Sequence, residues 1–583
     1  MTSLCLKLLI LAAFWTRASA ASFLPLGVLS WFWQGSVVVN KWLYIDSGEM
    51  WLAGNQVGND GYWGNVTYSI DLSKPWTTED LVPLVNPHTA GKDMLTRQPT
   101  MWYDSISNTV FWYGGWPYEM NVQPAVWGFT PNDAGNVTWS RKFAAGYGVS
   151  ASKESNFSSF TETAGALWAT SPTKYYSLGG FTSKENDPAF AGLDGFQPAL
   201  PGLVTYDFQT KSWGNSSSSG YHQSGLGVRG QAIFVPMYGK QGVIVFIGGD
   251  SPTSPAFNPG AALVSMMDIT IFDIDTGKFY TQVATGPKTP VPRTSFCAVG
   301  QSAADNSTFE IFVYGGFQGG DLNYAVVEPD LIDDLSRVWI LTLPAFTWIQ
   351  TDIKVSQRAA HRCEIIGNRQ MISIGGHIEN DAYKKDSWTN SMGIFDMTNL
   401  TWGFNYNPDA APYARSNVVK DYYADAKSPF PGTWNNPTLS TIFEKSTLSN
   451  VTALRSPTAT SGVPQTGTPL PDGSSSTTNT GAIVGGAVGA IVAIVSILLG
   501  IVFWRKRMAV KVNGMSAAPD PEPDMLVYQP HFEVDAEHRR FEMGFGMIPE
   551  MDEQRGVLEM NGLKEEGGVE RRMTEGSGLD TTA

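Results

Sequence analysis

The feature that most constrains this chain is a short phrase that recurs six times, an apolar run that ends in two glycines or a close variant. The six copies occupy residues 43–48, 110–115, 175–180, 243–249, 311–316 and 371–376. Measured at the last glycine, successive copies are 67, 65, 69, 67 and 60 residues apart. Self-similarity at a nearly constant interval predicts an architecture that is built from copies of one structural unit.

Each repeat contains four short runs of β-branched and aromatic residues separated by Gly, Asn, Asp and Pro, which is the pattern of strands. In the fifth repeat these runs lie at residues 293–299, 309–314, 337–341 and 346–349. Third strands are expected again at residues 68–71, 204–207, 270–273 and 393–396. Four strands per unit, repeated radially, make a β-propeller. The sequence therefore predicts an all-β fold, a six-bladed propeller with seven blades as the alternative.

A large aromatic residue recurs in the expected fourth strand of each repeat. We expect its ring to pack across its own blade or against the next, because burial of so large a ring stabilises a fold by roughly 2–3 kcal/mol. The six blade aromatics are Trp76, Trp139, Trp213, Phe279, Trp348 and Trp402.

Two phrases, Leu-Pro-Ala-Phe-Thr-Trp at 343–348 and Cys-Glu-Ile-Ile-Gly-Asn-Arg-Gln-Met at 363–371, resemble kelch proteins of filamentous fungi. With them the chain resembles a kelch-repeat β-propeller, which is related in fold to the central domain of galactose oxidase. The resemblance covers about residues 34–425 and implies a fold, not a particular function. Two repeats depart from the pattern, with Ser47-Gly48 in the first and Phe279 in place of Trp in the fourth, and irregular blades are expected there.

The two ends of the chain predict a protein that is anchored in a membrane. Residues 1–20 have the pattern of a secretory signal peptide that ends in Ala18-Ser19-Ala20. Residues 481–504 are uncharged and long enough to span a bilayer, and the basic residues 505–507 that follow place the C-terminus in the cytoplasm. We expect a type I single-pass protein, with a propeller ectodomain at 21–445, a Ser/Thr/Pro-rich stalk at 446–480 and a disordered tail at 505–583.

Glycosylation sequons occur only before the predicted span, which agrees with a propeller on the extracellular or lumenal side of the plasma membrane or another secretory-pathway membrane. Their asparagines are Asn65, Asn136, Asn156, Asn215, Asn306, Asn399 and Asn450.

Cysteine usage leaves two alternatives. Cys5 is removed with the signal peptide, so the mature chain keeps Cys297 and Cys363, in corresponding first strands of consecutive repeats. In an oxidising compartment they form either a disulfide or two buried thiols, and the sequence does not decide between them.

The strand order places the long connections on one face of the propeller, which we call the top. Candidate binding residues on this face are Arg97, Arg229, Arg293, Arg358 and His377. The arginines each precede a first strand, close to the mouth of the central channel. They form either an anion site for an acidic peptide or glycan, or structural ion pairs between blades, and the structural interpretation is favoured.

An enzyme is the less favoured alternative, a secretory-pathway carbohydrate-active enzyme of oxidase type. The histidines of the ectodomain, His88, His222, His361 and His377, are scattered, and no nucleophile elbow, phosphate loop or zinc spacing is present. We therefore expect no catalytic residue, metal or other cofactor, and a binding role in adhesion, cell-wall sensing or scaffolding.

Two further expectations concern partners. Gly481, Gly485, Gly489 and Ala493 form a stripe of small residues on the predicted membrane helix, which is either a dimerisation face or ordinary helix composition. With a formal net charge of −15, the chain is not expected to bind nucleic acid.

Overall fold

The computed structural model of this protein describes residues 22–53, 62–88, 94–118, 125–144, 160–187, 190, 197–255, 262–318, 329–379, 381–426 and 428–444. The predicted signal peptide, stalk, membrane helix and tail lie outside them. Within these residues, none of the helices is long and apolar enough to cross a membrane.

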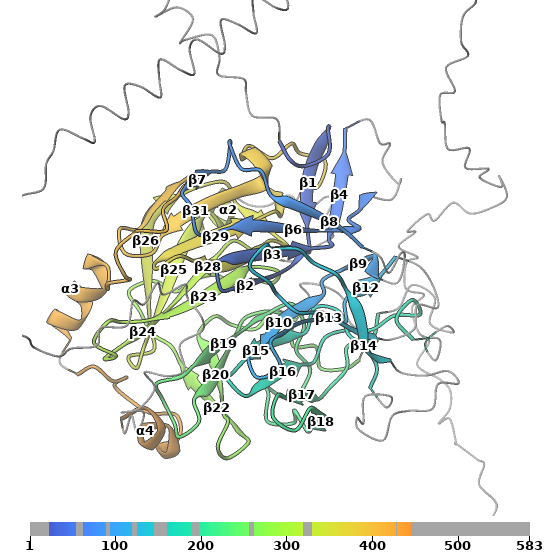
Figure 1. Cartoon of the computed structure of the whole chain (residues 1–583). Helices are drawn as coiled ribbons and strands as arrows, with labels where there is room; N and C mark the ends of the chain where they lie inside the picture. The colour runs from blue at the N-terminus through green and yellow to red at the C-terminus, as the bar shows by residue number, and fades with distance from the viewer. Residues whose placement is uncertain are drawn as a thin grey trace, which may run out of the picture. The chain divides into compact units, whose positions relative to one another are not determined.

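Six four-stranded antiparallel sheets form the six blades of a β-propeller, as the sequence predicts, and the seven-bladed alternative is wrong (Figure 1). Blades one to three are β2 (Gly35–Val39), β3 (Trp42–Asp46), β6 (Val66–Asp71) and β8 (Leu84–Pro87); β10 (Thr100–Asp104), β11 (Thr109–Tyr113), β13 (Ala125–Phe129) and β14 (Ser140–Ala144); and β15 (Leu167–Thr170), β16 (Lys174–Leu178), β17 (Leu203–Asp207) and β18 (Ser212–Ser216). Blades four to six are β19 (Gln231–Val235), β20 (Val243–Ile247), β21 (Asp268–Asp273) and β22 (Lys278–Val283); β23 (Cys297–Ser302), β24 (Phe309–Tyr314), β25 (Arg337–Leu343) and β26 (Thr347–Lys354); and β28 (Arg362–Ile366), β29 (Gln370–Ile374), β31 (Met392–Asp396) and β32 (Thr401–Gly403).

The recurring glycine pair follows each second strand and joins neighbouring blades. The N–H of the second glycine donates to a carbonyl of the next blade in all six cases, from Gly48 to Thr96 through to Gly376, which donates to Trp31 and closes the circle. Both glycines of a pair have positive φ, for example 70° and 94° at Gly114 and Gly115. A Cβ on Gly114 would lie 2.7 Å from a backbone oxygen of the next blade, so the position requires glycine. The phrase is therefore a junction between blades.

Four of the six blade aromatics lie in fourth strands as expected: Trp213, Phe279, Trp348 and Trp402. Their rings pack toward the preceding blade. The Trp348 indole, for example, donates to the Met266 carbonyl of blade four over 2.7 Å. Blade four is a complete four-stranded sheet despite Phe279, so the irregularity expected there is not observed.

The other two aromatics lie elsewhere. Trp139 directly precedes β14, and Trp76 lies in β7 (Trp76–Thr77), which is not a blade strand. The fourth strand of blade one is β8, further along the chain, because the residues after Trp76 leave the blade to pair with the C-terminal part of the propeller.

A clasp of two short strands joins the first blade to the end of the propeller. The strand β33 (Asn405–Tyr406) pairs with β7, and the Tyr406 and Trp76 rings stack at 4.9 Å. The Tyr406 hydroxyl donates to the Leu72 carbonyl over 2.9 Å. No blade combines strands from both ends of the described chain, so this clasp and the junction from Gly376 to Trp31 hold blade six to blade one.

Residues 405–444, here called the C-terminal strap, cross the bottom face. After β33 the strap contains the helices α3 (Asn417–Asp425) and α4 (Pro437–Glu444), which Figure 1 shows outside the strands on the side of β24 and β22. The hydroxyls of Tyr413 and Tyr422 bond to Glu310 and Thr347 in blade five, and the Ile442 carbonyl accepts from Gly239 in a turn of blade four. These partners lie in or beside bottom turns, so the strap covers the bottom of blades four and five.

The remaining short elements lie at the top. β1 (Val28–Phe32), β4 (Glu49–Leu52) and β5 (Tyr62–Trp63) form an extra sheet beside blade one, and β9 (Thr96–Arg97) and β27 (Arg358–Ala359) pair with β12 (Trp116–Pro117) and β30 (His377–Ile378). α2 (Pro329–Leu335) and the 3-10 helix η4 (Thr389–Ser391) lie in connections between second and third strands. In blade three that connection has residues 179–202, whereas its first turn has residues 171–173. The long connections share the top face, as predicted.

Candidate functional site

The mouth of the central channel is surrounded by six residues at equivalent positions just before the first strands. All six have positive φ, between 53° and 63°, although only one is glycine. These residues, here called the mouth ring, are Trp33, Gln98, Gly165, Arg229, Ser295 and Ala360. Five backbone hydrogen bonds of 2.6–2.9 Å link successive members around the ring, such as Ser295 N–H to the Arg229 carbonyl. The ring is a rigid rim at the top of the propeller.

Trp33 lies at the centre of a cluster of aromatic rings and guanidinium groups on this rim. The guanidinium carbons of Arg97 and Arg229 lie 4.8 and 5.4 Å from its ring centroid. Arg97 also stacks on Trp116 at 3.9 Å and pairs with Glu49 at 2.6 Å, and Arg229 lies 5.0 Å from the Phe181 centroid. Cation–π contacts of this kind hold both arginines in place.

The two arginines of this cluster differ in how far they are buried. The Arg97 side chain is 18% exposed, whereas Arg229 is only 7% exposed. Burial lowers the pKa of Arg229 to about 10, which the neighbouring Asp250 opposes and the positive charge of Arg97 reinforces. Arg97 is therefore the guanidinium of this cluster that solvent and a ligand reach.

Arg293 and Arg358 have a different environment, two positions before the mouth ring. Both side chains are fully buried, and each donates to the carbonyl of the first glycine in its own blade, Gly315 or Gly375. Each also pairs with a carboxylate from a top connection, Asp334 for Arg293 and Asp386 for Arg358, the latter at 2.6 Å. These contacts support the structural interpretation for this pair of arginines.

Comparison with known proteins gives a distant relative and a weak structural likeness. No protein-family model matches the sequence. The sequence is 28% identical over 337 residues to a kelch repeat-containing protein of Arthroderma benhamiae, and the match covers 52% of this chain and 46% of that relative, about half the length of each. The chain is thus similar over about half its length to a kelch repeat-containing protein, and its described residues form a six-bladed β-propeller. The solved structure titled YjhT is similar over 64% of this chain and 97% of its own, with 14% identity and a TM-score of 0.42.

The described histidines of this propeller do not gather in one site. His88 lies at the start of a loop between blades one and two, His222 before blade four, and His361 and His377 in the sixth repeat. Burial lowers the pKa of His377 to about 4 and lowers the pKa of His361 well below its usual value, so both imidazoles are neutral near pH 7. His377 is 1% exposed and packs edge-on against Phe32 at 5.6 Å, so the candidate binding role of His377 has no exposed surface to act through.

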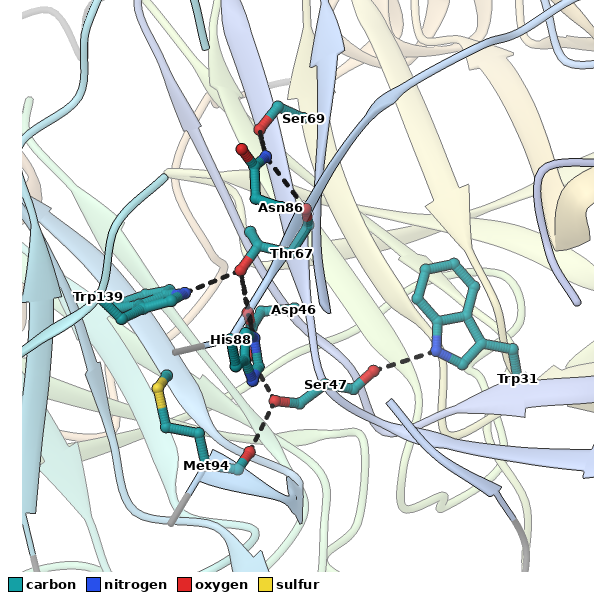
Figure 2. A network of polar contacts seen from close by, with 9 residues as sticks. All are labelled: Trp31, Asp46, Ser47, Thr67, Ser69, Asn86, His88, Met94 and Trp139. Atoms are coloured by element: carbon teal, nitrogen blue, oxygen red, sulfur yellow. Dashed lines mark hydrogen bonds and ion pairs between the residues drawn. The ribbon is translucent and has the colours of Figure 1, made fainter. Parts of the chain in front are cut away.

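His88 belongs to a buried polar network inside blade one (Figure 2). Its Nε2 lies 2.8 Å from Asp46 Oδ2, and the hydroxyls of Ser47 and Thr67 donate to the same carboxylate, each over 2.5 Å. The Trp139 indole donates to the Thr67 hydroxyl over 2.8 Å. The Ser47 hydroxyl bonds to the aspartate and not to the histidine, so the three do not have the order of a nucleophile, a base and an orienting acid. The network connects blades one and two.

Cys297 and Cys363 form a disulfide between the first strands of blades five and six, with Cα atoms 5.5 Å apart. Of the two alternatives that the sequence left open, a disulfide or two buried thiols, the structure therefore contains the disulfide. The bond joins adjacent innermost strands and cross-links the two blades below the mouth ring.

The sequon asparagines within the described residues are all exposed. Asn136, Asn306 and Asn399 lie in bottom turns, Asn215 lies in the outermost strand of blade three, and Asn65 directly precedes β6. Asn156 and Asn450 lie outside the described residues, as do the predicted membrane helix and its small-residue stripe.

The sequence did not reveal the mouth ring or the Trp33 cluster. Positive φ at Trp33 or Arg229 leaves no trace in residue type, because such conformations are typical of glycine and asparagine. The arginines were found through their position before first strands, but their registers differ, and only Arg97 and Arg229 come together.

Proposed function

We propose that this kelch propeller is a binding protein that recognises a protein or glycan ligand with its top face, in adhesion, cell-wall sensing or scaffolding. A single membrane span, with the propeller on the extracellular or lumenal side, would hold it at the plasma membrane or another secretory-pathway membrane. The observation that carries the proposal is the partly exposed guanidinium of Arg97, which the rings of buried Trp33 and partly exposed Trp116 hold at the mouth of the propeller.

The composition of this region supports a binding role. Trp, Tyr and Arg are the residues that dominate the energetics of binding surfaces. Beside Arg97, Trp116 is partly exposed and Tyr118 is 43% exposed. They lie on the short ribbon of β9 and β12, which pairs Arg97 with Trp116. Side chains held on a rigid scaffold bind without a large loss of conformational entropy.

The opposite face is less open to a ligand. The C-terminal strap covers the bottom of blades four and five, and three exposed sequon asparagines lie in bottom turns. The long connections between second and third strands emerge at the top, where loops on a rigid scaffold usually carry binding residues.

An array of glycans and peptides probed with the full-length chain tests the proposal. Arg97→Ala is expected to weaken binding of the selected ligand about tenfold or more, since loss of a central arginine commonly removes over 1.4 kcal/mol. Arg415→Ala is the matched control, because Arg415 is also a partly exposed arginine in an ion pair, with Asp305 on the bottom face. A ligand that binds both variants equally well would place the binding surface elsewhere and overturn the proposal.

A further inference from the structure

Three groups that commonly ligate metal ions converge between blades five and six. The Sγ atoms of Cys297 and Cys363 and a ring nitrogen of His361 all lie within 4.8 Å of one another. Cys297 is buried in β23, and Cys363 is partly exposed in β28, two residues after His361. The two sulfurs are joined in the disulfide, which leaves the imidazole beside them without an evident role.

Neither nitrogen of the His361 imidazole has a hydrogen-bond partner of standard geometry among the described residues, although both are buried. The ring packs edge-on against Tyr314 at 5.2 Å, and the Tyr314 backbone comes close without the geometry of a standard hydrogen bond. A buried polar group without a partner destabilises a protein. Common explanations for such a group are a redox role and the binding of an ion or a water molecule.

We propose that Cys297, Cys363 and His361 form a binding site for a soft d10 cation, Cu(I) or Zn(II), once the disulfide is reduced. Two molecules of a low-molecular-weight thiol supply two electrons and two protons and are themselves oxidised to a disulfide, and the S–S bond becomes two protein thiols. Cation binding then releases both thiol protons to solvent, and a nitrogen of His361 supplies the third electron pair.

The geometry of the two strands suits this ligand set. Metal–sulfur bonds are about 2.3 Å and metal–nitrogen bonds about 2.0 Å, so the ligand atoms of one cation lie about 3.5–4 Å apart. A disulfide holds its sulfurs about 2 Å apart, so after reduction the two sulfurs must move about 2 Å further apart to ligate one cation. With Cα atoms 5.5 Å apart, rotation of the two side chains provides this separation without movement of the strands.

The chemistry of the ligands selects the cation. Thiolates favour Cu(I) and Zn(II) over Mg(II) and Ca(II), which prefer oxygen ligands. A ligating histidine usually donates its second ring N–H to a backbone carbonyl or a carboxylate, and the nearby Tyr314 backbone would accept it after a small rotation of the ring. Cation binding would therefore give both nitrogens of His361 a partner.

Metal titration of the purified full-length chain tests this site. The protein is reduced with a phosphine, and the phosphine is then removed by gel filtration. The reduced protein is titrated with Cu(I) or Zn(II) against a coloured chelator under anaerobic conditions. The reduced wild type is expected to bind one equivalent of at least one cation, and the oxidised protein none. His361→Gln should lower the affinity about tenfold or more. His377→Gln is the matched control, because His377 is equally buried with unpartnered ring nitrogens but lies outside the cluster.

A second measurement needs no variant. In the reduced wild type, bound cation should slow maleimide labelling of Cys297 and Cys363 about tenfold or more, since a metal-bound thiolate is a poor nucleophile. The proposal is overturned if the reduced protein binds neither cation, or if a folded His361→Gln variant binds as tightly as wild type. Unchanged labelling in the presence of the cation would have the same consequence.

Discussion

At the scale of single residues, blade one shows how a departure from the repeat is accommodated. Ser47 replaces the first glycine of the pair and still adopts φ of 61°, close to the 56–74° of the five glycines at the same position. A non-glycine residue in this conformation is strained by about 1 kcal/mol or more. Asp46 accepts the Ser47 hydroxyl and also bonds to Thr67 and His88. The network thus holds the strained serine and joins blade one to blade two.

Loss of the central carboxylate tests that role. Asp46→Ala removes the common acceptor of two hydroxyls and the partner of His88, all buried. We expect the free energy of unfolding to fall by about 3 kcal/mol or more, the usual effect of removing one partner of a buried polar cluster. Asp71→Ala, in an exposed turn beside Lys74, should lower it by less than about 1 kcal/mol. Urea denaturation measures the loss of unfolding free energy in both variants. Equal denaturation midpoints for Asp46→Ala and Asp71→Ala would contradict the role assigned to the network.

A buried glutamate makes the stability depend on pH. Burial raises the pKa of Glu310 from 4.5 to about 7, even though Tyr413 and Thr342 donate hydrogen bonds to it. The folded protein therefore holds a proton on this carboxyl that the unfolded chain releases near pH 4.5. The resulting stability is fully present below pH 4.5 and is lost as the pH rises to about 7.

The Glu310→Gln variant isolates this contribution. Glutamine does not titrate, while the opposing contributions of the buried histidines remain in both proteins. Between pH 5 and pH 8 the wild type should lose on the order of 2 kcal/mol of unfolding free energy relative to Glu310→Gln, at 1.4 kcal/mol per unit of pKa difference. The measurement is urea denaturation at both pH values. A difference between the two proteins that does not change with pH would show that Glu310 is ionised throughout.

At the scale of elements, the clasp between β33 and β7 is one of the contacts that join blade six to blade one. Tyr406 is 3% exposed, stacks on Trp76 and donates to the Leu72 carbonyl. Tyr406→Ala should lower the unfolding free energy by about 3–5 kcal/mol and increase amide exchange in β7 and β33. Phe404→Ala, two residues earlier at an exposed position, should change it by about 0.5 kcal/mol or less. Equal stability of the two variants would show that the clasp does not hold the blades together.

The same elements show what the sequence could predict. The second strands, and the third strands of every blade except blade two, were predicted to within two residues, because each is a local apolar run with a glycine pair or a turn at its end. The clasp has two residues in each strand, about 330 positions apart, and such a pairing has no local signal. Trp76 was assigned to a blade because it resembles the other blade aromatics, whereas a tertiary contact with Tyr406 determines its place.

The candidate site was less predictable for a related reason. The sequence placed arginines near the channel mouth, but a shift of two residues separates buried Arg358, paired with Asp386, from Arg229 on the rim. Only the backbone conformation of the mouth ring sets this register, and most of its members are not glycine. For the same reason Trp33, at the centre of the cluster, had no signal in the sequence.

At the scale of the whole molecule, the faces of the propeller differ in what covers them. The C-terminal strap ends at the bottom of blade four, where Ile442 bonds to Gly239, and the predicted stalk begins within a few residues of that point. Exposed sequons lie in bottom turns of blades two, five and six. The strap, which leads toward the predicted stalk, lies on the bottom face. The Trp33 cluster lies on the opposite, top face.

The proposed topology gives a prediction for the chain in cells. The five sequon asparagines of the described residues are exposed, so each is open to glycosylation if the propeller enters the secretory pathway. Treatment with an endoglycosidase should then lower the apparent mass of the full-length chain, and a protease added to intact cells should remove the propeller and leave a C-terminal fragment of the tail, if the protein is at the cell surface. In sealed microsomes the tail should be the sensitive part. An unglycosylated chain, or a tail and propeller with the same protease sensitivity, would contradict a single span between them.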